Sequence, residues 1–437
     1  MSRILVAGAG YGGLTAAINL AKNGISVTVL EEKQESELGH DWHDSLDIGA
    51  FEKSGVRKPS SDKFSFAKQH GYINPSASTA KISFPSKPST IVMDRKILTS
   101  HLCECAKEAG VTFSFSEKIC TPLVKDKVVT GIETVKNGKK IFHECDLLID
   151  AAGMYSPVRS KLPSECGIQN KFNESNIFHI FRAYYKNTTG ETSTPSYLIN
   201  LFHMNRAGID WTSGEKEYVD VLIGKFGVAG KLTEKDVEEA LADYRKNYPY
   251  ISNETLRGGV FADIPLTKML PMIVCDGYAA VGDSAGMVQP LNGCGIAISM
   301  QAGKILADTI IASNGNYNKG SLWKYQYEYF YRFGKTLALL NKIKNLSVLI
   351  DSEKIDAFFG SDFVNAAAEK IMNSEKTEFG IRAYVDLFRF LPKLSSLIVP
   401  CMKTVTDIPF AIMIAYTMPK KYDSKRVDSW VNFYKKI

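Results

Sequence analysis

Residues 4–13 read ILVAGAGYGG, and this stretch decides the fold. Its first four residues are apolar, as in a buried strand, and glycines follow at once. We expect a strand over 3–8, a helix over 12–23 that ends before Gly24, and a second strand over 25–30. A strand, a tight glycine turn, a helix and a strand within such a short stretch form a βαβ unit.

The glycines have the Gly-x-Gly-x-x-Gly spacing of a dinucleotide-binding turn, with Gly12 as an additional glycine inside it. Gly8 would make the turn, Gly10 would let a pyrophosphate approach the helix N-terminus, and Gly13 would allow close helix–strand packing. Glu31 ends the second strand, where a carboxylate can bind both hydroxyls of a ribose. A glycine turn without a ligand is the alternative, and this motif alone does not separate NAD from FAD.

Composition limits the other classes of protein. The 437 residues are 45% hydrophobic and 23% charged, which indicates a globular chain of two or three domains. The eight cysteines are irregularly spaced, which favours a reducing cytoplasm over a disulfide framework or a zinc site. A net charge of +6 is too small to indicate nucleic-acid binding.

A second motif lies far downstream, where a strand over 278–283 ends in Gly-Asp-Ser-Ala-Gly. The carboxylate of Asp283 at the strand end can accept hydrogen bonds from polyol hydroxyls, which suits an extended FAD better than a nicotinamide dinucleotide. A solvated strand-end aspartate is the alternative. A third motif, Pro-Leu-Asn-Gly-Cys-Gly-Ile over 290–296, leads into a helix over 295–311 and presents free amides at its start.

The run GDSAGMVQPLNGCGI over 282–296 resembles the geranylgeranyl reductase-like family of FAD-dependent oxidoreductases, within the p-hydroxybenzoate hydroxylase-fold flavoproteins. Hydroxylases of that fold usually have His at the position of Gly286. They also have an Asp-Gly pair where this chain has Ala152 and Gly153. Both differences favour a reductase.

The resemblance implies FAD as cofactor and identifies residues that would contact it. The residues that match the family's FAD contacts well are Gly12, Glu31, Arg95, Asp283, Gly295 and Ile296. Cys120, near the adenine, and Asp44 and Ser45, beside the flavin, match more loosely. The predicted cofactor-binding residues are Gly8, Gly10, Gly12, Gly13, Glu31, Asp44, Ser45, Arg95, Cys120, Asp283, Gly295 and Ile296. A surface position at a helix start is the alternative for Arg95.

The predicted fold is α/β: a Rossmann-like FAD-binding domain, an antiparallel β-sheet substrate domain and a helical C-terminal region. The predicted boundaries are 1–170 plus 260–315, 171–259, and 316–437. Further helices are expected over 94–109 and over 233–248, the latter with a capping pair of Thr233 and Asp236. Strands are expected near 111–116, 127–135, 140–143 and 147–149, and alternation predicts antiparallel strands between 175 and 228; residues 34–90 have no firm assignment.

The leading functional hypothesis is reduction of carbon–carbon double bonds in a hydrophobic, isoprenoid or lipid, substrate by hydride from flavin N5. The alternatives are a single-component aromatic monooxygenase and a non-enzymatic flavin or lipid carrier. Cys294 and His43 are the candidate proton donors, and a buried small residue and a structural loop are their respective alternatives. Trp211 is the candidate substrate residue, although the Phe-Pro that follows this Trp in the family is missing. No metal site is expected, because His40 and His43 have no identifiable third ligand.

No second glycine motif offers a dedicated nicotinamide domain, so electrons would come from transiently bound NAD(P)H or a ferredoxin-like carrier. From Gly380 onward, ten Lys and Arg against four Asp and Glu leave an excess of six positive charges, which equals the net charge of the chain. An apolar stripe over 387–398 and the run 408–418 accompany these charges. We expect either a helical cap or a surface that contacts anionic lipid at the inner face of the membrane. The start of the chain carries no cleavage site of a secretory signal peptide.

Overall fold

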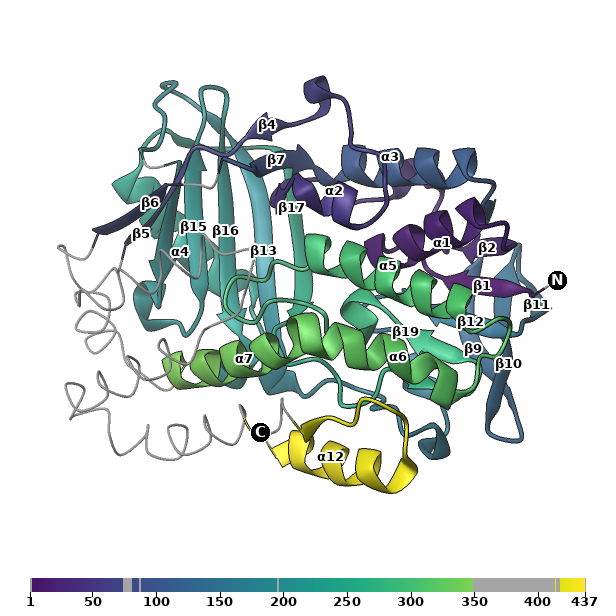
Figure 1. Ribbon diagram of the computed structural model, residues 1–437. Helices are drawn as coiled ribbons and strands as arrows, with labels where there is room; N and C mark the ends of the chain where they lie inside the picture. The colour runs from purple at the N-terminus through teal and green to yellow at the C-terminus, as the bar shows by residue number, and fades with distance from the viewer. Residues whose placement is uncertain are drawn as a thin grey trace.

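The computed structural model describes residues 2–73, 81–85, 88–194, 196–348, 413 and 417–436. Within them, a parallel sheet with helices packed on it lies beside a large antiparallel sheet (Figure 1). This arrangement confirms the predicted α/β class with a second, antiparallel sheet. The apolar run 387–398 and most of the run 408–418 lie outside the described residues.

The first sheet has six strands and carries the βαβ unit. The strands are parallel except β18, and their order is β18 (Val274–Cys275), β19 (Tyr278–Ala280), β12 (Leu147–Asp150), β1 (Ile4–Ala7), β2 (Val27–Leu30) and β8 (Thr112–Ser114). Helices α1 (Tyr11–Lys22), α3 (Arg95–Glu108) and α5 (Ile296–Ala312) pack together, with α1 between the other two. Every residue of β1 and β12 is buried, as the apolar run at residues 4–7 predicts.

A three-stranded sheet is attached to the first sheet through the contact of β10 with β12. Its strands are β9 (Lys118–Lys125), β10 (Val128–Lys136) and β11 (Lys139–Glu144). Strands β10 and β11 match the strands predicted near 127–135 and 140–143, whereas no strand is predicted where β9 lies. Only two of the eight β9 side chains are fully buried, so its apolar pattern is weak.

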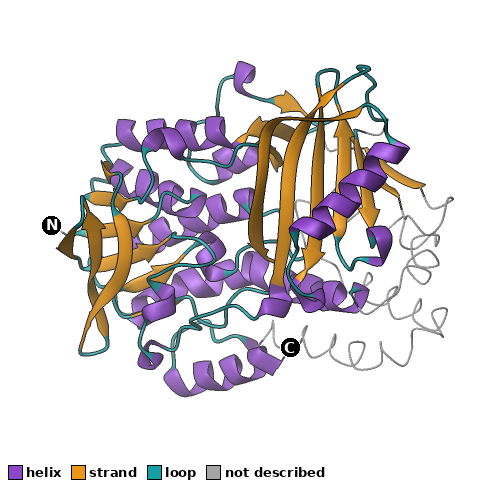
Figure 2. Cartoon of the chain, turned by 180° about the vertical axis from the view of Figure 1, so that it is seen from behind, coloured by secondary structure: helices purple, strands orange, loops and turns teal. Residues whose placement is uncertain are grey.

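The second large sheet has seven strands, and it is antiparallel except where β14 pairs with β5. The order is β17 (Ile251–Pro265), β13 (Ile177–Asn187), β16 (Tyr218–Phe226), β15 (Ile209–Gly214), β14 (Tyr197–Leu201), β5 (Gln69–Ile73) and β6 (Lys81–Pro85). Helix α4 (Glu234–Asn247) covers part of one face (Figure 2). The capping pair at its start is confirmed, since Asp236 N–H donates to Thr233 Oγ1 at 3.2 Å and Thr233 N–H donates to Asp236 Oδ2 at 2.9 Å.

Strand β17 is the longest strand among the described residues, and no strand is predicted from the sequence at this position. It forms one edge of the seven-stranded sheet, and only two of its fifteen residues are buried, so it lacks the apolar alternation of a half-buried strand. Gly258 and Gly259 both have φ of +73°, and the pairing with β13 shifts register beside them. Such a glycine pair in a strand marks a β-bulge.

A small sheet in the unassigned part of the sequence joins the two large sheets. Its order is β3 (His43–Asp47), β7 (Thr90–Asp94) and β4 (Ser65–Phe66), and the short helix α2 (Gly49–Lys53) follows β3. Arg257 of β17 donates to Asp94 of β7 at 2.5 Å, which ties the antiparallel sheet to this connection. The segment from β3 to β7 therefore forms the connection between the parallel sheet and the large antiparallel sheet.

The described C-terminal elements are helical, as predicted. They are α6 (Lys319–Tyr329), a π-helical turn (Phe330–Gly334), α7 (Lys335–Ser347) and α12 (Ser424–Lys436). Helix α12 packs back on the turn, with the Trp430 and Tyr434 rings 5.1 and 5.6 Å from the ring of Phe330. Short 3₁₀ turns lie at Glu35–Glu37, Ser61–Lys63, Arg159–Lys161, Ser164–Cys166, Glu174–Asn176, His203–Asn205, Gly227–Ala229 and Gly282–Ala285.

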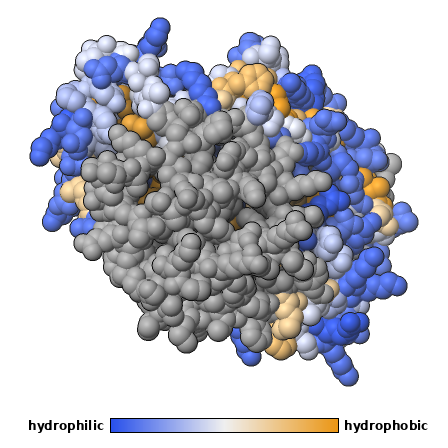
Figure 3. Space-filling view, turned by 60° about the vertical axis from the view of Figure 1, so that its left-hand side comes forward, coloured by the Kyte–Doolittle hydropathy of each residue, from blue (hydrophilic) through white to orange (hydrophobic). Residues whose placement is uncertain are grey.

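The described residues that are visible on one face of the molecule are mainly hydrophilic (Figure 3). On the face drawn in Figure 3, described hydrophobic atoms form separate small groups among hydrophilic ones. The apolar side chains collect instead in a core around β1, β12 and α1, with smaller clusters on the second sheet. Within the described residues, no helix has the length and apolar character that a membrane crossing requires.

Candidate cofactor and substrate site

The glycine turn is packed so closely that side chains would not fit. Gly8 has φ of +89°, in the left-handed region that favours glycine. A Cβ on Gly10 would lie 2.7 Å from the Ala151 carbonyl oxygen, and a Cβ on Gly13 would lie 2.5 Å from the Ala151 Cβ. The turn therefore rests against the end of β12. Among the described residues, no side chain caps the first turn of α1, so its amides stay open.

The downstream motif meets the glycine turn directly. A Cβ on Gly12 would lie 2.5 Å from the Val281 side chain and 3.0 Å from the Ser299 carbonyl oxygen. Gly303 lets α5 cross α1 closely, because a Cβ there would overlap the Gly12 carbonyl oxygen. The first turns of the two helices therefore lie side by side, beside the strand end that carries Asp283.

Glu31 lies at the end of β2 and is 8% exposed. Its Oε2 accepts the Ala9 N–H at 2.8 Å and its Oε1 accepts the Lys33 N–H at 2.9 Å. Each carboxylate oxygen can accept a second hydrogen bond. The geometry thus holds an acceptor pair beside the turn, where the sequence predicts ribose hydroxyls.

Asp283 provides the test of whether the turn suits a polyol ligand. It lies in the Gly282–Ala285 turn and is partly buried, and among the described residues no hydrogen bond reaches its carboxylate. Burial raises the pKa of Asp283 and the positive charge of Arg95 lowers it. A Cβ on Gly295 would lie 3.7 Å from its Oδ1, so the start of α5 faces it. A half-buried acceptor with nothing to accept calls for a hydroxyl donor.

Arg95 connects the glycine turn to the small sheet. Its Nε donates to Tyr11 Oη at 3.0 Å, and its guanidinium lies 5.3 Å from the Tyr11 ring and 5.9 Å from the Trp42 ring. Asp94 caps α3 by accepting the Lys96 N–H at 2.8 Å, which fixes the helix start that carries Arg95. We call the glycine turn, Glu31, Arg95, Asp283 and residues 294–296 the cofactor cradle.

The start of α5 completes the cofactor cradle. Gly295 precedes Ile296, the first residue of the helix, and no side chain caps this end. Burial, together with the negative charge of Asp44, raises the pKa of the Cys294 thiol to about 12. Cys294 is nevertheless exposed at the surface, so solvent reaches this residue.

A chain of ion pairs leads from the cofactor cradle into the antiparallel sheet. Arg95 Nη1 lies 3.4 Å from Asp44 Oδ2, and Arg182 Nη1 donates to Asp44 Oδ1 at 2.9 Å. Arg182 also pairs with Asp220 through two hydrogen bonds, at 2.9 and 2.6 Å. Arg182 and Asp220 are buried. We call Arg95, Asp44, Arg182 and Asp220 the ion chain.

His43 lies beside the end of the ion chain. Its Nε2 is 3.1 Å from Tyr197 Oη and 3.6 Å from Asp220 Oδ2, and its backbone N–H donates to Tyr184 Oη at 3.1 Å. Burial lowers the pKa of His43, against the attraction of Asp220. His40 lies in the preceding loop and stacks on Trp42 with ring centroids 4.3 Å apart. Because β3 begins at His43, the two histidines are not on one helix.

Trp211 lies in the same part of the sheet. Its ring is 5.2 Å from the Arg182 guanidinium and 6.2 Å from the Tyr197 ring. Its Nε1 is buried and has no hydrogen-bond partner among the described residues. The predicted substrate residue therefore lies near His43 and the ion chain.

Two of the predicted cofactor-binding residues, Ser45 and Cys120, belong neither to the cofactor cradle nor to the ion chain. Ser45 pairs with Val92 inside the small sheet, one residue beyond Asp44. Cys120 lies in β9, where its carbonyl accepts a hydrogen bond from Lys161 Nζ at 2.7 Å. In the described part of the chain, no hydrogen bond or ion pair links Cys120 to the glycine turn.

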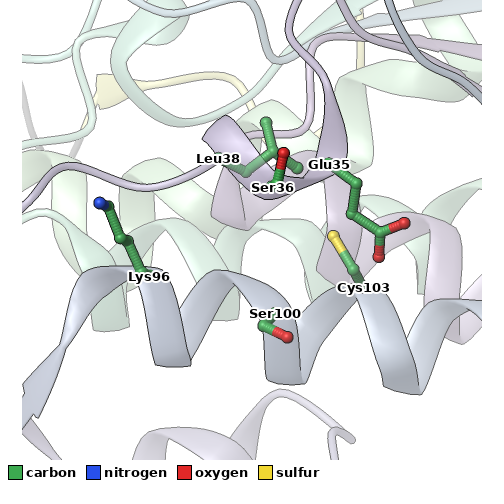
Figure 4. Close-up of a pocket in the computed structure, with 6 residues that line it drawn as sticks. All are labelled: Glu35, Ser36, Leu38, Lys96, Ser100 and Cys103. Atoms are coloured by element: carbon green, nitrogen blue, oxygen red, sulfur yellow. The ribbon is translucent and has the colours of Figure 1, made fainter.

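A pocket of about 440 Å³ lies between the Glu35–Glu37 turn and α3 (Figure 4). Its lining residues are Glu35, Ser36, Leu38, Lys96, Ser100 and Cys103. Burial raises the pKa of the Cys103 thiol to about 12, with smaller effects from Glu35, Lys107 and Glu31. The pocket therefore lies close to the Glu31 end of the cofactor cradle.

Sequence reasoning missed Arg182, Asp220 and Tyr197. Arg182 falls between Ile180 and Tyr184 on the same face of β13, which is otherwise almost wholly buried. A charged residue that interrupts a buried strand is a usable signal, because it requires a partner. Its partner Asp220 interrupts β16 in the same way.

Comparison with known proteins identifies the family. The family described as "FAD binding domain" matches residues 1–328, and the chain belongs to it. A digeranylgeranylglycerophospholipid reductase of Methanococcoides burtonii is 26% identical over 81% of this chain and 86% of its own length. One of Methanothrix thermoacetophila is 25% identical over 90% of this chain and 97% of its own. A geranylgeranyl bacteriochlorophyll reductase-like protein of Thermoplasma acidophilum has the same fold, with a TM-score of 0.74 and 19% identity over 92% of this chain and 99% of its own.

The cofactor is FAD, and the chain is an FAD-dependent oxidoreductase. The residues present fit this group: two adjacent helix starts without side-chain caps suit a pyrophosphate, and the unpartnered Asp283 suits a polyol.

Proposed function

We propose that this FAD-binding chain reduces carbon–carbon double bonds in a hydrophobic lipid that carries isoprenoid chains. The observation that carries the proposal is the ion chain, which joins the cofactor cradle to the antiparallel sheet through Asp44. A flavin at the cradle and a substrate at the sheet would then meet at one place. The relatives named as digeranylgeranylglycerophospholipid reductases support the substrate class.

The proposed division of the chain has a cofactor domain over 1–170 plus 260–315, a substrate domain over 171–259 and a helical region over 316–437. Strand β17 crosses the boundary at 260, and β5 and β6 from the first segment join the antiparallel sheet. In this proposal the glycines of the turn hold the pyrophosphate, Glu31 holds the ribose and Asp283 accepts from the polyol. The open start of α5 at Gly295 and Ile296 would face the flavin ring. Asp44, Ser45, Arg95 and Cys120 complete the proposed contacts.

Bound FAD would supply a hydride at its N5 atom. The protein would hold the substrate in place, exclude water and supply one proton to the second carbon. His43 and Cys294 are the two proposed proton sources. Trp211 would form part of the substrate wall, where the missing Phe-Pro of the family allows a different substrate shape.

We propose NAD(P)H or a ferredoxin-like protein as the electron donor. We also propose a cytoplasmic location at the inner face of the membrane. The excess of positive charge after residue 380 would favour contact with anionic lipid there. Binding to anionic vesicles that salt abolishes would support this contact, and absence of binding at low salt would exclude it.

Anaerobic reoxidation tests the reaction. The holoprotein is reduced with dithionite and mixed with a phospholipid that carries geranylgeranyl chains, and the flavin absorbance and the lipid mass are followed. Reoxidation with a gain of two hydrogens per double bond supports the proposal. Rapid reoxidation by oxygen with a hydroxylated aromatic product would establish a monooxygenase instead. Tight FAD binding without turnover of any donor or substrate would indicate a carrier.

A further inference from the structure

The side chains around His43 are arranged to exchange a proton. The imidazole is 15% exposed, so solvent reaches it, while its Nε2 faces Tyr197 Oη at 3.1 Å and Asp220 Oδ2 at 3.6 Å. The hydroxyl of Tyr197 can accept one hydrogen bond and donate another. It can therefore stand between the imidazole and a third group, as a proton relay requires.

The charges that face His43 come from four strands and balance each other. The acidic side chains are Asp44 and Asp220, and the basic ones are Arg182 and Arg257. The phenols of Tyr184, Tyr197 and Tyr218 contact or face the imidazole. With two negative and two positive neighbours, the neutral imidazole is favoured by burial, and one added negative charge nearby would favour the protonated form.

The cofactor cradle can provide that added charge. The ion chain runs from Arg95, beside the glycine turn, through Asp44 and Arg182 to Asp220, beside His43. Two electrons on the bound cofactor would place negative charge at the cradle end. Because Arg182 and Asp220 are buried, Arg95 and Asp44 are only partly exposed and the four side chains are in contact, that charge is screened less than it would be at the surface.

We propose that His43 and Tyr197 are a proton-delivery pair in which His43 takes up a proton from solvent when the cofactor is reduced. This inference deepens the proposed function and, in its second half, rests on it. A hydride carries two electrons to one carbon of the double bond. Tyr197 Oη–H gives its proton to the other carbon, and His43 Nε2–H restores the proton on Tyr197. His43 ends neutral, and one proton from water has entered the product.

The pair differs from Cys294, the other candidate donor. Burial raises the pKa of both the Cys294 thiol and the Tyr197 phenol. The Tyr197 hydroxyl lies 3.1 Å from His43 Nε2, which can restore its proton, whereas among the described residues no hydrogen bond links the Cys294 thiol to a histidine. The pKa of His43 is lowered by burial, so its proton leaves readily once the cofactor charge is gone. Only a group whose proton affinity follows the charge at the cofactor can both take up and release it within one turnover.

The first test measures proton uptake without any substrate. The midpoint potential of the bound flavin is determined between about pH 5 and pH 9, a range that spans the ordinary pKa of histidine. In a window of this range the wild type should take up one more proton per two electrons than the His43→Gln variant. His143→Gln is the matched control, since this histidine also has a carboxylate partner, Glu117, but lies on the three-stranded sheet; it should keep the wild-type slope. Equal slopes for wild type and His43→Gln would overturn the proposal.

A second measurement on the unmodified chain covers the case in which His43→Gln does not fold. The ¹⁵N shifts of the His43 imidazole should change from neutral to protonated when dithionite reduces the holoprotein at neutral pH. Shifts that stay neutral in both states would overturn the proposal.

Tyr197→Phe separates the two members of the pair. It should keep the extra proton uptake, because His43 remains, but slow alkene-driven reoxidation more than tenfold while reduction by dithionite is unchanged. An unchanged reoxidation rate would remove Tyr197 from the proposal. If the wild type reduces no alkene, the proposed function fails, whereas the potential and the NMR measurements still decide whether His43 takes up the proton.

Discussion

The cofactor cradle and the ion chain lie side by side but are held together differently. In the cradle, glycines bring backbones within contact distance, as at Gly10 and Gly13 against Ala151. In the ion chain, long side chains from separate strands meet, as Arg182 meets Asp44 and Asp220. The cofactor cradle is encoded mainly by short local motifs, although these motifs are themselves far apart, whereas the ion chain is formed by single residues from separate parts of the sequence. This explains why the residues of the cofactor cradle can be predicted from sequence motifs, whereas the pairing of Arg182 with Asp44 and Asp220 cannot.

Breaking the ion chain should have the largest effect. Arg182→Met leaves the buried Asp220 without its arginine and removes one of the two arginine partners of Asp44, so we expect a loss of about 3–5 kcal/mol in the free energy of unfolding. Urea unfolding followed by circular dichroism measures it. The double variant Arg182→Met with Asp220→Leu should recover much of the loss. A single variant within 1 kcal/mol of wild type, on the scale of an exposed pair, would show that the ion pair is not buried as described.

Adding a methyl group in the cradle should have the next largest effect. Gly10→Ala places a Cβ 2.7 Å from the Ala151 carbonyl oxygen. We expect a loss of about 1–3 kcal/mol in stability, typical of overpacking, and weaker FAD binding. Thermal unfolding and titration of the apoprotein with FAD measure the two effects. Gly138→Asn is the control, because a Cβ there meets nothing within 4 Å and Asn tolerates its φ of +73°. Unchanged FAD affinity in Gly10→Ala would contradict the close packing.

A local signal outside both regions should have a smaller effect. Thr233→Ala removes the side chain that caps α4, so we expect a loss of about 1 kcal/mol in the free energy of unfolding. Thr233→Ser keeps the cap and should be close to wild type. Equal losses for the two variants would mean that the threonine acts through its methyl group.

The smallest effect concerns a second histidine of the antiparallel sheet. Burial lowers the pKa of His203, but hydrogen bonds to Asp210 and Asp243 outweigh it and raise the pKa overall, against the charge of Arg206. Its contribution to stability is complete below the unfolded pKa of about 6.5 and is lost as pH rises through the folded pKa. We therefore expect the free energy of unfolding to fall with rising pH above about 6.5, and His203→Gln to lack this fall. Parallel pH profiles of the two proteins would contradict it.

The sequence was informative wherever structure follows from neighbours along the chain. The βαβ unit, the start of α3, the cap at Thr233 and the strand before Asp283 were predicted within a few residues. Strand β17 was not, because an exposed edge strand has no apolar alternation. Arg182 and Asp220 were not, because the register of β13 against β16 decides that they meet. For His43 the residue could be named, but its partner Tyr197 follows only from the order of strands in the sheet.

The cofactor cradle also has a consequence for synthesis. Gly10 and Asp283 are 273 residues apart (283 − 10), and Gly295 comes later still. During translation, the N-terminal βαβ unit leaves the ribosome long before β19 and α5 exist to cover the glycine turn. Strand β1 therefore lies in an incomplete sheet during this time. FAD cannot bind until the residues that complete the cofactor cradle have emerged. Flavin loading should follow the emergence of residues 283–296, and a nascent chain that ends before residue 280 should remain colourless.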